Sequence, residues 1–202
     1  MAIIKHRLPS RSEAWLLFIA CAFVVNVWSI FNLLRWMPSL LGHLKPVEIL
    51  VVFSYTQVFA LIESIVVFVA ILLIGFILPQ GALRDHWIAK GSIIVFITGL
   101  WTVGYHYFAD LLSAWRDFVD FLYPRLGLQV SEVGLLTAGF AIMVIAWITS
   151  YIIVLRRLYA RIRQKEAFAD RIHNLVERLA VLTLLYLASG LLGGIVVLIR
   201  NL

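Results

Sequence analysis

The sequence predicts an all-α protein: a polytopic bundle of five transmembrane helices that forms one integral membrane domain over residues 1–202. Three observations predict this fold. Hydrophobic residues make up 63% of the chain and charged residues only 14%, whereas soluble domains carry roughly 25% charged residues. Five apolar runs are long enough to cross a hydrocarbon core, which takes about 20 helical residues. Most Lys and Arg residues lie between or beside these runs.

The five spans are expected at the apolar runs, about 14–34, 47–78, 87–108, 133–155 and 179–199. Arg35 and Trp36 should close the first span, and residues 37–46 should form a short connection to the second. Basic and aromatic side chains are typical of the membrane interface, which is why we place a span end there.

Two amphipathic segments flank the spans. Segment 110–122 places Leu and Trp on one helical face and Asp on the other, which predicts an outer helix that lies in the interface or continues the third span. Segment 156–178 keeps helical spacing of apolar residues among many charges, so we expect a charged inner helical connection. Its turn is expected near Ala169 and Asp170.

The basic residues predict the orientation of the chain. Twelve of the 17 Lys and Arg residues lie on one side: before the first span, at the connection that ends in the first turn of the third span, or between the fourth and fifth spans. Cytoplasmic loops carry an excess of basic residues. We therefore expect a cytoplasmic N-terminus and an outer C-terminus in a plasma membrane of prokaryotic type. The same rule explains the net charge of +6, so no nucleic-acid partner is expected.

Glu63 is the most informative single residue, because it lies near the middle of the second span. A charge at that depth costs at least about 2.5 kcal/mol on insertion scales. Tyr55, Thr56 and Gln57 precede it, and Asn26 lies in the first span. Such polar residues can line an ion or proton path. The alternative, which we favour, is a protonated Glu63 that hydrogen-bonds to another helix and holds the bundle together.

Two further patterns lie in the third and fifth spans. His106 and Asp110 form an i, i+4 pair near the outer end of the third span, where they can relay protons or form a solvated helix end, the simpler interpretation. The fifth span carries two overlapping pairs of small residues. They predict close helix packing, within the chain or between subunits. These residues are Ser189, Gly190, Gly193 and Gly194.

A basic patch precedes the fifth span. It consists of Arg156, Arg157, Arg161, Arg163 and Lys165. Anionic lipid headgroups or a cytoplasmic partner can bind such a patch. The positive-inside bias of membrane proteins is already sufficient to explain it.

Catalytic motifs are not apparent in the sequence. There is no HExxH, no GxSxG and no phosphate-binding glycine loop, and the five histidines are scattered, so we expect no enzyme activity, metal or cofactor. We favour a non-catalytic accessory or scaffold subunit of a membrane complex, with a protein partner or a homo-oligomer in the lipid bilayer. An oligomeric ion or proton channel or small transporter with Glu63 in or near the path comes next, and a membrane-embedded lipid enzyme last.

Overall fold

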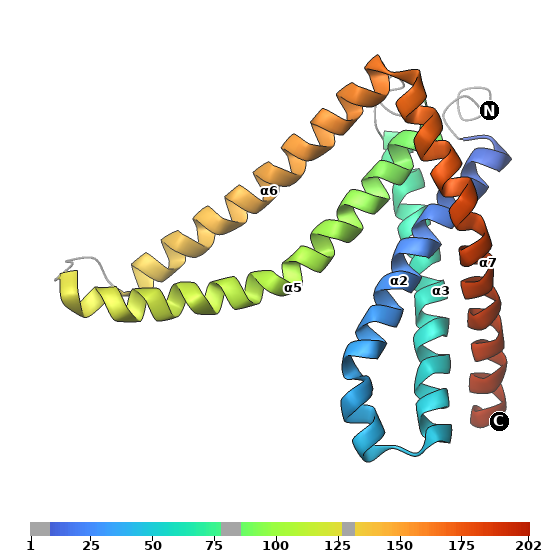
Figure 1. Ribbon diagram of the computed structural model, residues 1–202, viewed down its shortest axis with the longest axis horizontal. Helices are drawn as coiled ribbons and strands as arrows, with labels where there is room; N and C mark the ends of the chain where they lie inside the picture. Colours follow the sequence, from blue (N-terminus) through green and yellow to red (C-terminus); the bar gives the residue numbers. More distant parts are fainter. Residues whose placement is uncertain (1–8, 78–85, 127–131) are drawn as a thin grey trace. The chain divides into compact units, whose positions relative to one another are not determined.

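The computed structural model describes residues 9–77, 86–126 and 132–202, leaving aside the side chains of residues 105–109, 122–126 and 132. Within this part the chain folds into five long helices (Figure 1). They are α2 (Arg11–His43), α3 (Pro46–Ile77), α5 (Trp87–Leu126), α6 (Glu132–Gln164) and α7 (Glu166–Asn201). Each contains a stretch long and apolar enough to cross a membrane. The predicted all-α fold with five spans is confirmed, and the chain is an integral membrane protein.

The first connection is shorter than predicted, because α2 continues past Arg35 and Trp36 to His43. Only Leu44 and Lys45 separate α2 from α3, and the Leu44 N–H donates to the Leu40 carbonyl oxygen at 2.8 Å. The predicted connection over residues 37–46 was therefore wrong. Basic and aromatic side chains mark where the membrane ends, but they do not stop the backbone from continuing as a helix.

Segment 110–122 belongs to α5, which runs without a break from the third span. The sequence left open whether this segment is a separate interfacial helix or a continuation of the third span, and the structure shows the continuation.

The predicted turn near Ala169 and Asp170 was wrong, because both residues lie inside α7. The break falls at Lys165, which alone separates α6 from α7 and has extended backbone angles, φ −136° and ψ 97°. Glu166 follows it in the first turn of α7, where an acidic side chain is favourable beside free backbone N–H groups. No Gly or Pro marks this position, which is why the sequence pattern did not locate it.

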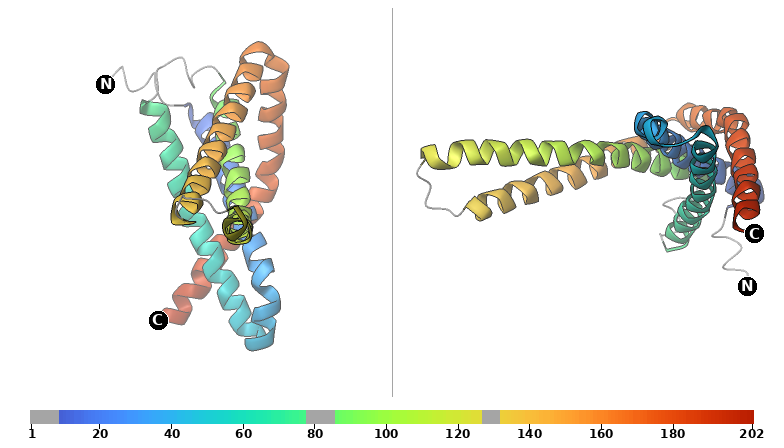
Figure 2. Two further views of the ribbon diagram at one scale, coloured as in Figure 1. Left: turned by 90° about the vertical axis from the view of Figure 1, so that its left-hand side faces the viewer. Right: turned by 90° about the horizontal axis from the view of Figure 1, so that it is seen from below.

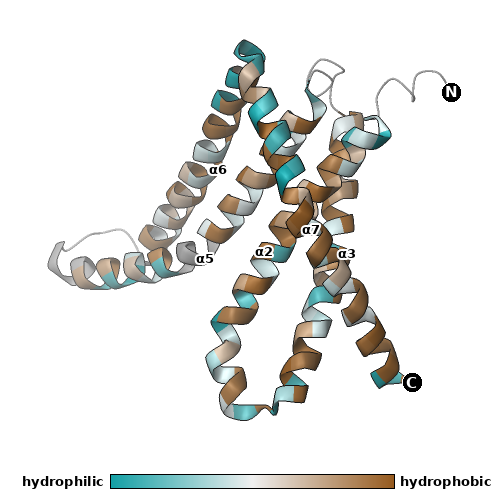
Figure 3. Ribbon diagram, turned by 45° about the vertical axis from the view of Figure 1, so that its right-hand side comes forward, coloured by the Kyte–Doolittle hydropathy of each residue, from teal (hydrophilic) through white to brown (hydrophobic). Residues whose placement is uncertain are grey.

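The chain divides into two compact units. The first contains the residues up to Phe96 and those from Arg161 onwards. In it, α2, α3 and α7 contact one another pairwise, and Figures 1 and 3 show them side by side. Ile19, Ala20 and Val176 form a buried cluster against Leu16, Phe96 and Ala180. The hydrophilic residues of α7 gather in its first turns and at its C-terminal end, and most of the helix between them is hydrophobic (Figure 3).

The second unit, residues 97–160, is a pair of antiparallel helices formed by α5 and α6 (Figure 2). Large side chains connect the pair. The rings of Trp101 and Trp147 lie 5.9 Å apart between centroids, and the hydroxyl oxygens of Thr98 and Tyr151 lie 3.0 Å apart.

Candidate functional site

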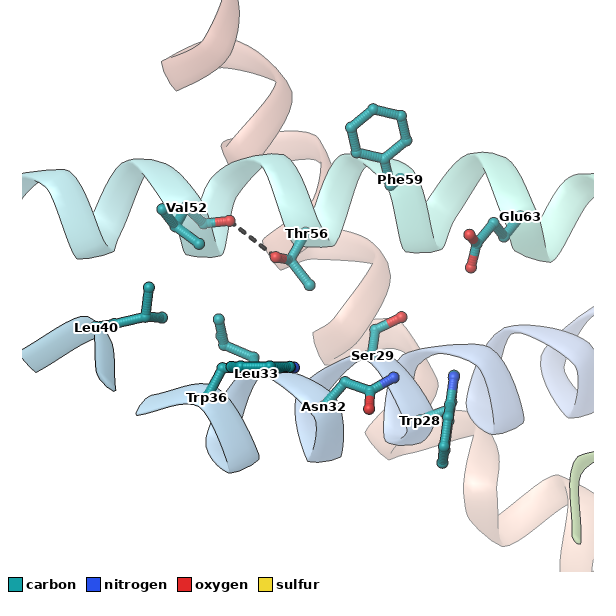
Figure 4. Close-up of a pocket in the computed structure, with 10 residues that line it drawn as sticks. All are labelled: Trp28, Ser29, Asn32, Leu33, Trp36, Leu40, Val52, Thr56, Phe59 and Glu63. Carbon is teal, nitrogen blue, oxygen red and sulfur yellow. Dashed lines mark hydrogen bonds between the residues drawn. The ribbon is translucent and has the colours of Figure 1, made fainter. Parts of the chain in front are cut away.

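A groove of about 450 Å³ lies between α2 and α3. The short turn between these helices makes them antiparallel neighbours, so residues at helical spacing on each form one wall. The lining residues are Trp28, Ser29, Asn32, Leu33, Trp36 and Leu40 from α2, and Val52, Thr56, Phe59 and Glu63 from α3 (Figure 4). Residues three or four apart share a helical face, which explains why these positions meet.

Glu63 is the only ionisable residue among those that line the groove. Its carboxyl group points toward α2 (Figure 4), its side chain is exposed, and no described residue forms a hydrogen bond or ion pair with it. It lies near the middle of α3. The groove therefore presents an unpaired carboxyl group at a depth where such a group is costly.

Three further polar side chains line the groove. The Thr56 hydroxyl donates to the Val52 carbonyl oxygen at 2.9 Å, so its proton is used within α3 while its oxygen can still accept. Ser29 and Asn32 lie half-buried on the opposite wall, and neither forms a hydrogen bond within the described residues. The groove thus offers a hydroxyl and an amide in addition to the carboxyl group.

Aromatic rings form much of the remaining lining. Trp36 and Trp28 follow each other along α2 with Asn32 between them, and the Phe59 ring points to the side of α3 that faces away from α2 (Figure 4). Trp36 is 64% exposed and Phe59 61% exposed. Sequence reasoning missed Trp28, Phe59 and Ser29 and identified Trp36 only as the end of a span. The signal was present, since Trp28, Asn32 and Trp36 recur every four residues and share one face of α2.

Gln57 lies on the other side of α3, fully buried beside α7. The Ser189 hydroxyl lies 2.8 Å from Gln57 Oε1 and 2.7 Å from the Tyr186 carbonyl oxygen, while Gln57 Nε2 has no partner. A hydroxyl has one proton to donate. With the Gln57 amide turned over, Nε2 would donate one N–H to Ser189 and Ser189 would donate to Tyr186, which gives both side chains a donor–acceptor contact. Gln57 thus belongs to the α3–α7 contact.

The small residues of α7 also face α3. A Cβ atom on Gly193 would lie only 2.8 Å from the Ser54 carbonyl oxygen, and one on Gly190 would lie 3.4 Å from the Gln57 carbonyl oxygen. A Cβ atom on Gly194 would make an ordinary 3.9 Å contact with Val58. The small residues therefore bring two helices of the same chain into backbone contact.

The other predicted site residues lie apart from the groove. Asn26 is buried and donates within its own helix, to the Ala22 carbonyl oxygen at 2.8 Å. The Tyr55 hydroxyl accepts from Asn201 Nδ2 at 2.9 Å, between α3 and the end of α7. Asp110 is exposed on α5. The side chain of His106 lies outside the described residues, so the His106–Asp110 pair has no described geometry.

The basic patch, defined above, is exposed throughout, and its five side chains form no ion pair within the described part of the chain.

A second cleft, of about 650 Å³, lies among the first turns of α2, α5 and α7. Two of its acidic side chains have partners within the chain. Glu13 accepts a hydrogen bond from the Ser10 N–H at 2.8 Å, and the Glu177 carboxylate lies 3.2 Å from His173 Nε2. No set of three or more His, Cys, Asp or Glu residues in the described ranges can hold a metal ion.

Comparison of the chain with protein-family models, with curated proteins and with solved structures gives no match.

Proposed function

We propose that this protein is a small, non-catalytic membrane transporter that binds its transported cation or proton at Glu63, in the groove between α2 and α3. The observation that carries this proposal is the carboxyl group itself, which opens unpaired into a groove near the middle of an apolar helix. Ionisable residues in spans commonly mark substrate, ion or proton pathways.

The surroundings of Glu63 support transport over a purely structural role. A carboxyl group that holds helices together is expected to hydrogen-bond to a neighbouring helix, and no described residue of this chain does so. Ser29, Asn32 and Thr56 continue the polar lining away from Glu63. A line of several weak polar sites suits transport, since a moving ion or proton must both bind and leave.

Flux through liposomes tests this proposal. Purified protein is reconstituted into liposomes, and a membrane potential is imposed to drive protons or cations inward. A pH-sensitive dye inside reports proton flux, and uptake of a radiolabelled cation reports cation flux. We expect flux in the wild type and its loss in Glu63→Gln. The matched control is Glu48→Gln, which makes the same change at the start of the same helix, outside the groove. Equal flux in wild type and Glu63→Gln would rule out the role of Glu63.

A second candidate is an accessory subunit that holds a partner protein through the same groove. The exposed rings of Trp36 and Phe59 favour it, since aromatic side chains are enriched at protein interfaces. A photo-cross-linking amino acid in place of Phe59, activated in native membranes, distinguishes the two. A protein adduct of defined mass supports the accessory subunit, and lipid adducts alone with flux in liposomes support the transporter.

A further inference from the structure

We infer that the groove between α2 and α3 binds hydrophobic organic cations, such as quaternary ammonium or phosphonium compounds. This inference rests on the proposed function and names the substrate class for the same site.

The sign of the charge is the first argument. Glu63 is the only ionisable group that lines the groove, and no described side chain neutralises it. A ligand that enters with a positive charge can therefore pair with this carboxylate. An anion would meet an unpaired carboxylate in a medium of low dielectric constant, where like charges repel strongly.

The lining favours an organic cation over a metal ion. Ca²⁺ takes six to eight oxygen ligands and Mg²⁺ needs near-octahedral oxygen geometry, whereas carbon and aromatic rings form most of these walls. Three lining residues, Trp28, Trp36 and Phe59, are aromatic, and the Phe59 ring lies on the outer side of α3 (Figure 4). A cation gains energy over an aromatic face when it lies within about 6 Å of the ring centre, and quaternary ammonium groups are commonly recognised in this way.

Size and access agree with this ligand class. A volume of about 450 Å³ falls in the range of about 300–1,000 Å³ that small-molecule sites occupy. Trp36 and Phe59, which both line the groove, are more than half exposed. A hydrophobic cation partitions into the bilayer and can enter from its side, past these rings, without crossing a polar surface.

Direct binding tests the inference without any need for transport. Radiolabelled tetraphenylphosphonium is titrated onto purified wild-type protein in lipid nanodiscs. Tetraphenylborate, which has nearly the same shape and the opposite charge, serves as the matched ligand. We expect saturable binding of the cation and none of the anion. Equal binding of both ions would overturn the inference, because it would show partitioning into lipid or apolar surface.

Variants locate the site. Glu63→Gln should weaken tetraphenylphosphonium binding at least ten-fold, and Glu63→Asp, which keeps the charge, should retain most of it. Trp36→Leu should weaken binding several-fold. Glu48→Gln and Trp15→Leu make the same changes outside the groove and should leave affinity unchanged. Size-exclusion profiles and circular dichroism check that each variant is folded.

The outcomes separate this inference from the proposed function. Binding that does not depend on Glu63, or no binding at all, overturns the inference. If Glu63-dependent proton flux persists in that case, the transporter proposal stands with another substrate. Glu63-dependent binding without any flux supports the ligand class and contradicts transport.

Discussion

The α3–α7 and α5–α6 helix pairs are held together in different ways. In the first, small residues let backbones touch, with Gly193 against Ser54. In the second, large rings fill the space, with Trp101 beside Trp147 and Trp115 against Gly139. Lipid tails are as apolar as Leu, so burial of apolar area gives membrane helices little reason to associate. Close van der Waals contact comes from backbone against backbone in the first pair and from large rings packed on glycines in the second.

The largest effect should come from Gly193→Ala, in the pair held by small residues. The added methyl group would lie 2.8 Å from a backbone oxygen of α3, and a backbone cannot move aside without separating the helices. We expect a loss of about 3 kcal/mol in the free energy of unfolding, at the upper end of the usual cost of overpacking. Unfolding in mixed detergent micelles, followed by circular dichroism, measures it.

Gly194→Ala is the matched control, since its added methyl group makes only a 3.9 Å contact with Val58. Equal losses in the two variants would contradict the view that backbone contact at Gly193 holds this pair.

A smaller effect is expected from Gly139→Ala, in the pair held by large rings. The new methyl group would overlap the Trp115 ring, but a side chain can rotate where a backbone cannot. We expect a loss of about 1 kcal/mol, at the lower end of the overpacking range, by the same unfolding measurement. Gly42→Ala, with no atom near its added methyl group, serves as the reference. A loss at Gly139 as large as that at Gly193 would remove the distinction between the two pairs.

The smallest effects should come from the hydrogen bonds across each pair. Ser189→Ala removes the contact with Gln57, and Tyr151→Phe removes the contact with Thr98. Each should cost about 0.6 kcal/mol, because separated helices in a membrane find other partners. Double-mutant cycles with Gln57→Leu and Thr98→Val measure the two coupling energies. A coupling energy above 2 kcal/mol in either pair would show that hydrogen bonding, and not packing, holds it.

The spans could be predicted from sequence because each needs only a long apolar run, and α3 agrees with its prediction almost residue for residue. The helix ends were harder. Arg35 and Trp36 are residue types of the membrane interface, but α2 continues past them to His43. Lys165 separates α6 from α7 without a Gly or Pro signal.

The neighbours of polar residues were not predictable. Periodicity places Gln57 on a face of α3, but only the packing of α7 gives it Ser189 as a partner. In the same way, the position of Glu63 in its span was evident, while the groove in front of it depends on how α2 lies beside α3.

The length of α3 has a consequence for Glu63. This helix has 32 residues, whereas a bilayer core takes about 20, so the helix can slide along the membrane normal and still span it. Glu63 lies within every stretch of that length, while Thr56 leaves the hydrocarbon when the C-terminal end of α3 is submerged. At the N-terminal extreme of this sliding range Glu63 lies only two residues, about 3 Å, from the edge of the hydrocarbon core, where its side chain can reach the lipid headgroups. At the central positions the carboxyl group is too deep to do so, and there its solvation must come from whatever enters the groove.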